Sequence, residues 1–318
     1  MSERSDNVRR SSWCGLFKLT VVGALSCLIA SSVHPALAGQ KTAKTVSGEG
    51  ITGVLKRHEQ FSSKFVAARN VDVWLPAGYA RGKRRRYPVV YMHDGQNVFD
   101  PRTAYGGVEW GVDETITRLV QSGVLREAIV VGIWNSPKRF AEYMPRKAVP
   151  FSNTKDIKNI ALDTQDEIIS DDYLKFLVRE LKPFIDSRYR TMRDRANTFV
   201  MGSSMGGLIS AYAISEYPRV FGGAACVSTH WPAGDGAGIE YLKTHMPDPR
   251  THKLYFDYGT ATLDAQYEPY QKRMDEVMLA AGYTEGKNWV TRKFEGAQHS
   301  EKSWSARVDI PLVFFLHK

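Results

Sequence analysis

The sequence predicts an α/β fold in which helices cover both faces of a mostly parallel central sheet. Three observations carry this prediction. Short apolar runs alternate with amphipathic stretches, no internal repeat interrupts them, and one apolar run leads through a glycine-flanked serine into a helix. In such folds the functional residues lie at the carboxyl ends of the strands. A mature chain of roughly 280 residues suffices for one domain of this kind with a large core.

The predicted elements alternate along most of the chain. We expect strands at residues 71–75, 87–92, 128–134, 198–201, 223–228, 253–258 and 289–294, with one or two more inside 51–66. We expect helices at residues 112–122, 171–189, 205–217, 269–281 and 301–316. The helix at 171–189 has the clearest signals, because Ser170 and two aspartates can cap its start and apolar residues recur at helical spacing.

The N-terminal residues have the pattern of a signal peptide. A basic leader with Arg9 and Arg10 precedes an apolar segment over residues 19–30, and Ala36-Leu37-Ala38 provides the small residues that a signal peptidase recognises. The apolar segment is about a dozen residues long, whereas spanning a bilayer takes roughly twenty. We therefore expect cleavage after Ala38, no stable membrane anchor, a single domain over residues 39–318, and a periplasmic or secreted location.

The chain is basic, with 43 Lys and Arg residues against 34 Asp and Glu residues and a net charge of +9. The densest basic run, residues 81–86, contains no interleaved aromatic residue, so we interpret it as a solvated loop and expect no nucleic-acid partner. Cys226 is the only cysteine outside the predicted signal peptide. The mature domain therefore has no internal disulfide and depends on its core for stability.

The most informative motif is Gly202-Ser203-Ser204-Met205-Gly206, which lies between a predicted strand and a predicted helix. It matches the G-x-S-x-G turn of α/β-hydrolase folds, in which a strained backbone with positive φ presents the serine hydroxyl above the sheet. Gly202 and Gly206 stand two residues on either side of Ser204, where neighbouring backbone comes too close for side chains. The spacing therefore selects Ser204 over Ser203 as the candidate nucleophile.

A serine nucleophile needs a histidine base and a group that orients this base. In this fold the order along the chain is nucleophile, acid, histidine, and His299 directly follows the last predicted strand. Asp264, in the loop after the preceding strand, is the favoured acid, and Asp257 and Glu268 are the alternatives. The expected role of His299 is to accept the serine proton and later return it to the leaving group.

Two backbone N–H groups are needed to stabilise the oxyanion that forms during acyl transfer. Met205, directly after the serine, is expected to supply one of them. Gln96, in the loop after the strand at 87–92, is expected to supply the other. His93 and Asp94 in the same loop have no partnered cluster of histidines or carboxylates elsewhere, so we assign no metal.

Three blocks of sequence carry a family resemblance. They are residues 87–100 (Tyr-Pro-Val-Val-Tyr-Met-His-Asp-Gly-Gln-Asn-Val-Phe-Asp), residues 202–207, and residues 296–304 (Gly-Ala-Gln-His-Ser-Glu-Lys-Ser-Trp). Together they resemble the putative esterase (esterase D-like) family of α/β-hydrolases, which includes feruloyl and acetyl-xylan esterases, enterochelin-type siderophore esterases and, more remotely, mycolyltransferases. The likeness extends from about Phe61 to the C-terminus. The loop at 259–264 is longer than the usual Gly-Thr-x-Asp of the family, which keeps a Ser–His dyad open as an alternative.

The resemblance implies a catalytic triad of Ser204, Asp264 and His299, with the N–H groups of Met205 and Gln96 as the oxyanion hole. It implies a serine carboxylesterase without a cofactor. Its substrate would be a carbohydrate-linked feruloyl or acetyl ester, or a siderophore ester, cleaved through a covalent acyl-enzyme. An acyltransferase to a cell-wall or sugar alcohol with the same triad is the alternative, and a binding protein on a hydrolase scaffold is the third interpretation.

The expected substrate contacts lie near the carboxyl ends of the strands. Trp231 and Trp134 each follow or end a predicted strand, where they could stack on an aromatic acyl group or a sugar. Residues 139–165 show no clear helix or strand, so we expect them to form a cap over the site. Arg139, Glu142 and Tyr143 are the candidate polar contacts within this cap.

Overall fold

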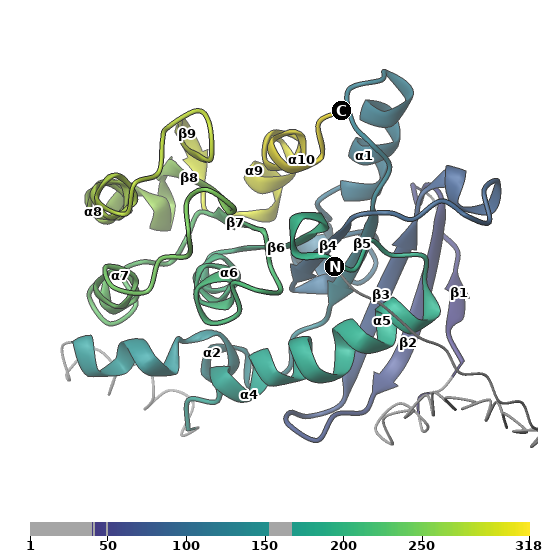
Figure 1. Cartoon of the computed structure of the whole chain (residues 1–318), viewed down its shortest axis with the longest axis horizontal. Coiled ribbons are helices and arrows are strands. Elements are labelled where there is room, and N and C mark those ends of the chain that lie inside the picture. Colours follow the sequence, from purple (N-terminus) through teal and green to yellow (C-terminus); the bar gives the residue numbers. More distant parts are fainter. Residues whose placement is uncertain (1–39, 41, 49, 153–166) are drawn as a thin grey trace, which may run out of the picture. The chain divides into compact units, whose positions relative to one another are not determined.

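The computed structural model describes residues 40, 42–48, 50–152 and 167–318 (Figure 1). The predicted signal peptide lies outside these residues, as does the second half of the expected cap. Within the described residues, no helix is both long enough and apolar enough to cross a membrane.

The centre of the fold is a nine-stranded sheet with the strand order β1-β2-β3-β5-β4-β6-β7-β8-β9. The pairings from β1 through β2 and β3 to β5 are antiparallel, and those from β5 through β4 to β9 are parallel. The strands are β1 Lys44–Val46, β2 Val54–Phe61, β3 Arg69–Leu75, β4 Val89–His93, β5 Ile129–Ile133, β6 Thr198–Ser203, β7 Gly223–Val227, β8 Lys253–Ala261 and β9 Trp289–Gln298.

Helices cover both faces of this sheet, as the sequence predicts (Figure 1). Successive strand residues alternate between two cores: Val90 and Met92 pack with α1, α9 and α10, whereas Val89 and Tyr91 pack with α2 and α4 to α8. The predicted α/β class is therefore confirmed. The helices are α1 Val112–Gln121, α2 Arg139–Tyr143, α4 Ser170–Lys175, α5 Lys182–Arg188, α6 Met205–Glu216, α7 Ala237–Leu242, α8 Glu268–Ala280, α9 Glu301–Ser305 and α10 Asp309–Leu316.

Several helices differ from their prediction in detail. The helix expected at 171–189 forms in three consecutive pieces, which are α4, a π-helical turn over Phe176–Leu181, and α5. The helix expected at 301–316 is interrupted between α9 and α10. Helix α7 was not predicted, because it is short and follows Gly234 and Gly236, whose positive φ values are typical of a loop.

The expected cap over residues 139–165 has more regular structure than its sequence indicates. It begins with α2 and continues with a 3-10 helix over Arg146–Phe151, while residues 153–165 lie outside the described part of the chain. Tyr143 and Met144 are buried in the core below it. The prediction of an irregular cap is therefore wrong for its first half. This segment has no apolar periodicity in its sequence, but burial of Tyr143 and Met144 stabilises its short helices.

The parallel strands bring the candidate residues to one edge of the sheet. Strands β6, β7, β8 and β9 pair in parallel, so their carboxyl ends lie on the same side. Ser204 directly follows β6, Asp264 lies shortly after β8, and His299 directly follows β9. Residues that are far apart in the sequence thereby reach one site.

Candidate active site

Ser204 occupies a strained turn between β6 and α6. Its φ of 57° and ψ of −122° lie outside the regions that L-residues favour. A Cβ on Gly202 would lie 2.7 Å from the backbone of Gly206, so this shoulder of the turn requires glycine. Ser204 N donates to Val227 O at 2.9 Å, and Ser204 O accepts from His230 N at 3.1 Å. The turn thus has the predicted elbow geometry and is held by backbone hydrogen bonds.

The candidate histidine and the favoured acid lie against each other. His299 Nδ1 is 2.5 Å from Asp264 Oδ1, and Asp264 Oδ2 accepts from Ser228 Oγ at 2.6 Å and from Gly259 N at 2.7 Å. Burial by itself raises the pKa of Asp264, but hydrogen bonds from His299, Ser228 and Gly259 outweigh it and hold this pKa below its usual value. Asp264 is therefore a carboxylate that fixes the orientation of the His299 ring.

The two alternative acids are engaged elsewhere. Asp257 is completely buried and accepts from Arg307 Nη2 at 2.9 Å. Glu268 forms two ion pairs with lysines on the surface, each at 2.9 Å. Of the three carboxylates that the sequence proposes, Asp264 is the one placed against His299.

A pocket of about 310 Å³, the Ser204 pocket, opens at the elbow and contains both Ser204 and His299. Burial raises the pKa of Tyr267, the nearby Ser204 hydroxyl partly opposes this rise, and the Tyr267 hydroxyl lies 2.6 Å from His230 Nδ1. Sequence reasoning missed Tyr267, although this residue shares a loop with Asp264. Besides Ser204 and His299, the residues that line the pocket are Asp94, Gln96, Asn97, Tyr105, Asn135, Arg139, Ser203, Glu301 and Trp304.

Met205 and Gln96 lie on the two turns where the sequence places the oxyanion hole. Met205 is the first residue of α6, so its N–H has no acceptor within the helix. Gln96 belongs to the 3-10 turn Gly95–Asn97 after β4 and lines the Ser204 pocket. A Cβ on Gly95 would lie 2.3 Å from the backbone of Gly132, so the turn packs tightly against β5. Both turns are fixed by close backbone contacts.

A partly buried ion pair forms part of the wall of the Ser204 pocket. Arg139, at the start of α2, donates from Nε and Nη2 to the two oxygens of Asp94 at 2.7 and 2.8 Å. Asn135 Nδ2 donates to Asp94 Oδ1 at 2.7 Å. Burial by itself lowers the pKa of Arg139, but the Asp94 carboxylate raises it above its ordinary value. Arg139 therefore lines the pocket with its charge neutralised by Asp94, and its contact with a substrate stays a prediction.

The other predicted substrate contacts do not line the Ser204 pocket, and among them Tyr143 is completely buried. Trp231 is 1% exposed and packs in the core. Trp134 donates from Nε1 to Asp72 Oδ2 at 2.9 Å. Glu142 is completely buried and forms a bidentate ion pair with Arg69 at 2.8 and 2.6 Å. These predictions are wrong for the described pocket, because each side chain packs against partners from distant parts of the chain.

Sequence reasoning also missed two pocket residues that follow His299. Burial raises the pKa of Glu301, which begins α9. The ring of Trp304 lies edge-on to that of His299 at 4.9 Å, and its Nε1 donates to Ser228 Oγ at 3.0 Å. Both residues belong to the block at 296–304 that carries the family resemblance. The resemblance did not reveal which side of this helix faces the pocket.

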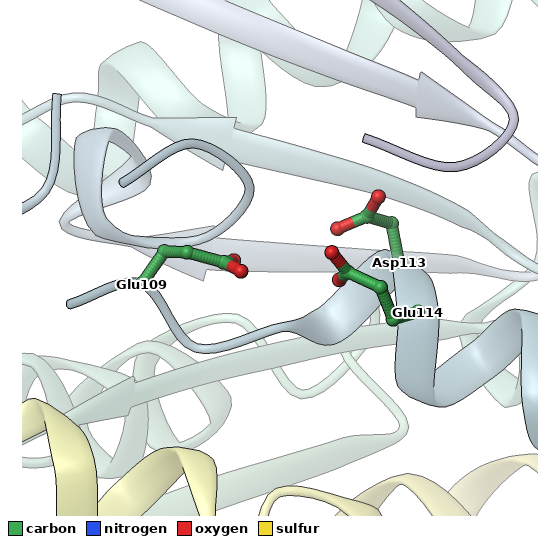
Figure 2. Close-up of side chains that lie close together, drawn as sticks. All are labelled: Glu109, Asp113 and Glu114. Carbon is green, nitrogen blue, oxygen red and sulfur yellow. The ribbon is translucent and has the colours of Figure 1, made fainter. Parts of the chain in front are cut away.

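Three carboxylates outside this pocket converge near the start of α1. Glu109, Asp113 and Glu114 have oxygens within 4.8 Å of one another, and among the described residues they form the group that could hold a metal ion (Figure 2). Burial and then the neighbouring Glu114 raise the pKa of Asp113 to about 8, and burial raises the pKa of Glu109 to about 7. Bound protons therefore offset much of the negative charge of this acidic cluster near neutral pH.

Among known proteins, the family model described as "Putative esterase" matches residues 62–310. The uncharacterized protein YbbA of Bacillus subtilis is 24% identical over 260 residues, which cover 79% of this chain and 91% of that protein. An endo-1,4-beta-xylanase/feruloyl esterase of Xylanibacter ruminicola is 24% identical over 250 residues, which cover 74% of this chain and 28% of that protein.

Solved structures share the fold. A ferulic acid esterase superposes with a TM-score of 0.61 at 19% identity, covering 87% of this chain and 99% of its own. The enterobactin esterase FES from Shigella flexneri, solved in the presence of 2,3-dihydroxy-N-benzoyl-glycine, superposes with a TM-score of 0.56 at 18% identity, covering 86% of this chain and 59% of its own. These likenesses confirm the predicted α/β-hydrolase fold.

Proposed function

This chain belongs to the putative esterase family, and on that premise we propose that it is an exported serine carboxylesterase that acts through a covalent acyl-enzyme. Family membership supports the hydrolysis of a carboxylic ester. One observation supports the finer proposal: His299, joined to Asp264 at 2.5 Å, shares a pocket with the strained Ser204. Export rests on the signal-peptide pattern of residues 1–38.

The first half of the reaction uses His299 as a base. Because Nδ1–H of His299 donates to Asp264, its Nε2 is free to accept the proton of the Ser204 hydroxyl. The serine oxygen attacks the ester carbonyl carbon, and the N–H groups of Met205 and Gln96 stabilise the resulting oxyanion. As this intermediate collapses, the imidazolium protonates the leaving alcohol and the acyl group stays on the serine.

The second half repeats these steps with water. A water molecule gives a proton to His299 and adds to the acyl carbonyl, and the same N–H groups hold the new oxyanion. The bond to Ser204 Oγ then breaks, the serine regains its proton from the imidazolium, and the acid is released. Asp264 stays ionised throughout because its pKa is lowered, so its charge offsets that of the imidazolium in both halves.

The leaving alcohol that fits this pocket is neutral and rich in hydroxyl groups. Arg139 is neutralised by Asp94, and the lining adds the carboxyl group of Glu301 and the amides of Asn97 and Asn135. Such groups hydrogen-bond hydroxyls. Among the described lining residues, no unpaired lysine or arginine would offset the charge of an anionic catecholate complex. The pocket therefore favours a carbohydrate-linked ester over a siderophore ester.

The nucleophile is tested with a fluorophosphonate probe and a matched pair of variants. We expect the probe to label the wild type and Ser203→Ala but not Ser204→Ala. We also expect Ser204→Ala to lose roughly 10⁴-fold or more in kcat, as on removal of a triad member. Labelling at Ser203, or full turnover by Ser204→Ala, would show that the elbow has been misinterpreted.

The substrate is tested by comparing kcat/KM on a feruloyl sugar ester, an acetylated sugar and a catecholate siderophore ester. The sugar esters should be preferred because the pocket offers hydroxyl-binding groups. Adding an acceptor alcohol and analysing the products separates hydrolysis from acyl transfer, and N-terminal sequencing of the exported protein tests cleavage after Ala38. A preference for the siderophore ester would contradict the electrostatic argument.

A further inference from the structure

A second concave site lies at the edge of the sheet opposite the Ser204 pocket. This groove of about 580 Å³, the amino-edge groove, lies where β6 to β9 begin. Its lining includes residues at or just before the first residues of these strands, namely Ala196, Gly222, Lys253 and Asn288. Because these strands run parallel, their starts and their carboxyl ends lie on opposite sides of the sheet. The groove is therefore separate from the site of the proposed esterase.

The lining of the amino-edge groove is basic. Arg126, Arg250, Lys253 and Lys287 belong to it, and no aspartate or glutamate is among its described lining residues. Arg250 is paired with Asp248 at 2.7 Å, so its charge is offset. Lys253 and Lys287 form no ion pair with any described residue. The groove therefore presents positive charge that the surrounding protein leaves uncompensated.

Arg126 adds a half-buried cation with neutral partners. Its guanidinium donates to Asn197 Oδ1 at 2.8 Å and to the carbonyl oxygen of Phe315 at 3.4 Å, and its buried Nε has no partner among the described residues. Burial lowers the pKa of Arg126, and the charge of Asp194 only partly opposes this. Partial burial of a cation whose hydrogen-bond partners are neutral costs free energy, and an anion in the groove would recover part of it.

Hydrogen bonds join the loops around the groove in the absence of a ligand. Asn288 Nδ2 donates to Pro249 O at 2.6 Å, and its Oδ1 accepts from Thr284 N at 2.7 Å. The buried ring of His252 places Nε2 at 2.7 Å from Pro218 O. These bonds join the segments that carry the basic residues, so a ligand would find the site largely formed.

We propose that the amino-edge groove binds a small ligand that carries two or more phosphate groups. Arg126, Lys253 and Lys287 supply the uncompensated positive charge, and guanidinium and ammonium groups both form charge-assisted hydrogen bonds with phosphate oxygens. The volume of about 580 Å³ leaves room for more than a single phosphate. The net charge of +9 attracts such anions to the protein. This binding is independent of the proposed ester hydrolysis.

The test is calorimetric titration of the whole purified protein with inorganic tripolyphosphate. The double variant Lys253→Gln/Lys287→Gln should bind about tenfold or more weakly, because each removed cation contributes a charge-assisted contact. The control Lys83→Gln/Arg84→Gln removes the same charge from an exposed loop in the densest basic run, and it should change the affinity by no more than about twofold. Thermal unfolding of each variant checks that the fold is retained.

Four results would overturn the proposal. The first is a wild type that does not bind tripolyphosphate at millimolar concentration. The second is an equal loss of affinity in both double variants, which would indicate attraction by net charge alone. Inorganic phosphate binding as tightly as tripolyphosphate would exclude a site for several phosphate groups. Ser204→Ala should bind tripolyphosphate as the wild type does, and a loss there would move the ligand to the Ser204 pocket.

Discussion

Two buried aspartates of this protein differ in their protonation near neutral pH. Asp264, beside His299, is ionised, whereas Asp113, in the acidic cluster, largely retains its proton. Their exposed fractions are 1% and 0%, so burial does not distinguish them. Asp264 accepts hydrogen bonds on both oxygens, and its pKa is lowered. Asp113 accepts from Thr52 on one oxygen, lies beside another carboxylate, and has a pKa of about 8 (Figure 2).

The difference shows that the surrounding donors, rather than depth, decide the charge of a buried carboxyl group. Burial penalises the ionised form in both places. Around Asp264, hydrogen bonds from His299, Ser228 and Gly259 offset this free-energy penalty. The side chain therefore stays ionised and can orient the His299 ring. Around Asp113, the nearest charged neighbour is another acid, so a proton is retained instead. An aspartate thus carries a fixed negative charge in one region and retains a proton near neutral pH in the other.

The largest effect that tests this comparison is expected for Asp264→Asn. The change keeps the shape of the side chain but removes the charge that stabilises the imidazolium, so kcat should fall by roughly 10³- to 10⁴-fold. Steady-state kinetics on a sugar ester measures this loss. The matched control, Asp113→Asn, should keep kcat within about twofold, because Asp113 lies outside the Ser204 pocket. If Asp264→Asn retains most of its activity, the enzyme works as a Ser–His dyad.

Asp113→Asn should instead change the pH dependence of stability. Between pH 4 and pH 8 the folded protein holds a proton on Asp113 that the unfolded chain has released, so the stability of the wild type falls as pH rises through this range. The variant avoids this loss and should be more stable by roughly 1–3 kcal/mol at pH 9, with little difference at pH 4. Urea unfolding at the two pH values measures both quantities.

The acidic cluster offers a further check on this prediction. An equal change at both pH values would mean that the variant acts through packing and not through the proton of Asp113. A rise in wild-type melting temperature with added Ca²⁺ at pH 9, reversed by a chelator and absent in Asp113→Asn, would show that a cation can replace the proton.

A smaller effect is expected for Ser228→Ala. Ser228 Oγ donates to Asp264 Oδ2 at 2.6 Å and accepts from Trp304 and Arg307, so its loss loosens the carboxylate without removing its charge. We expect kcat to fall about tenfold, which corresponds to one charge-assisted hydrogen bond. No change in Ser228→Ala would show that the other donors suffice to orient Asp264.

The smallest effect is expected for Glu109→Gln. Burial raises the pKa of Glu109 to about 7, so this group also costs stability as pH rises from about 4.5 through 7. The side chain is partly exposed, and solvent screening should limit the gain of the variant at pH 9 to about 0.5 kcal/mol. Unfolding in urea compares it with Asp113→Asn. If Glu109→Gln gains more unfolding free energy at pH 9 than Asp113→Asn does, Glu109 and not Asp113 is the group whose ionisation costs more stability.

Much of the fold and part of the candidate site could be predicted because their signals are local. Alternating apolar and amphipathic runs predicted the strands and helices, and Gly202 and Gly206 marked the turn around Ser204. Helix α7 and the first half of the cap were missed, since short helices that rely on a few core anchors leave no periodic pattern. Chain order selected Asp264 and His299, which the structure then places 2.5 Å apart.

The sequence by itself determined the α/β-hydrolase fold, the glycine-flanked elbow and the loops from which the candidate catalytic groups come. These follow from backbone sterics and from the period of apolar residues, which act over a few positions. Only the tertiary structure decided that Trp231 lies in the core while Trp304 lines the pocket. It also decided that Asp257 forms an ion pair with Arg307. The partners in that ion pair stand 50 positions apart. Burial and pairing over such separations are set by the packing of whole elements, which no local pattern records.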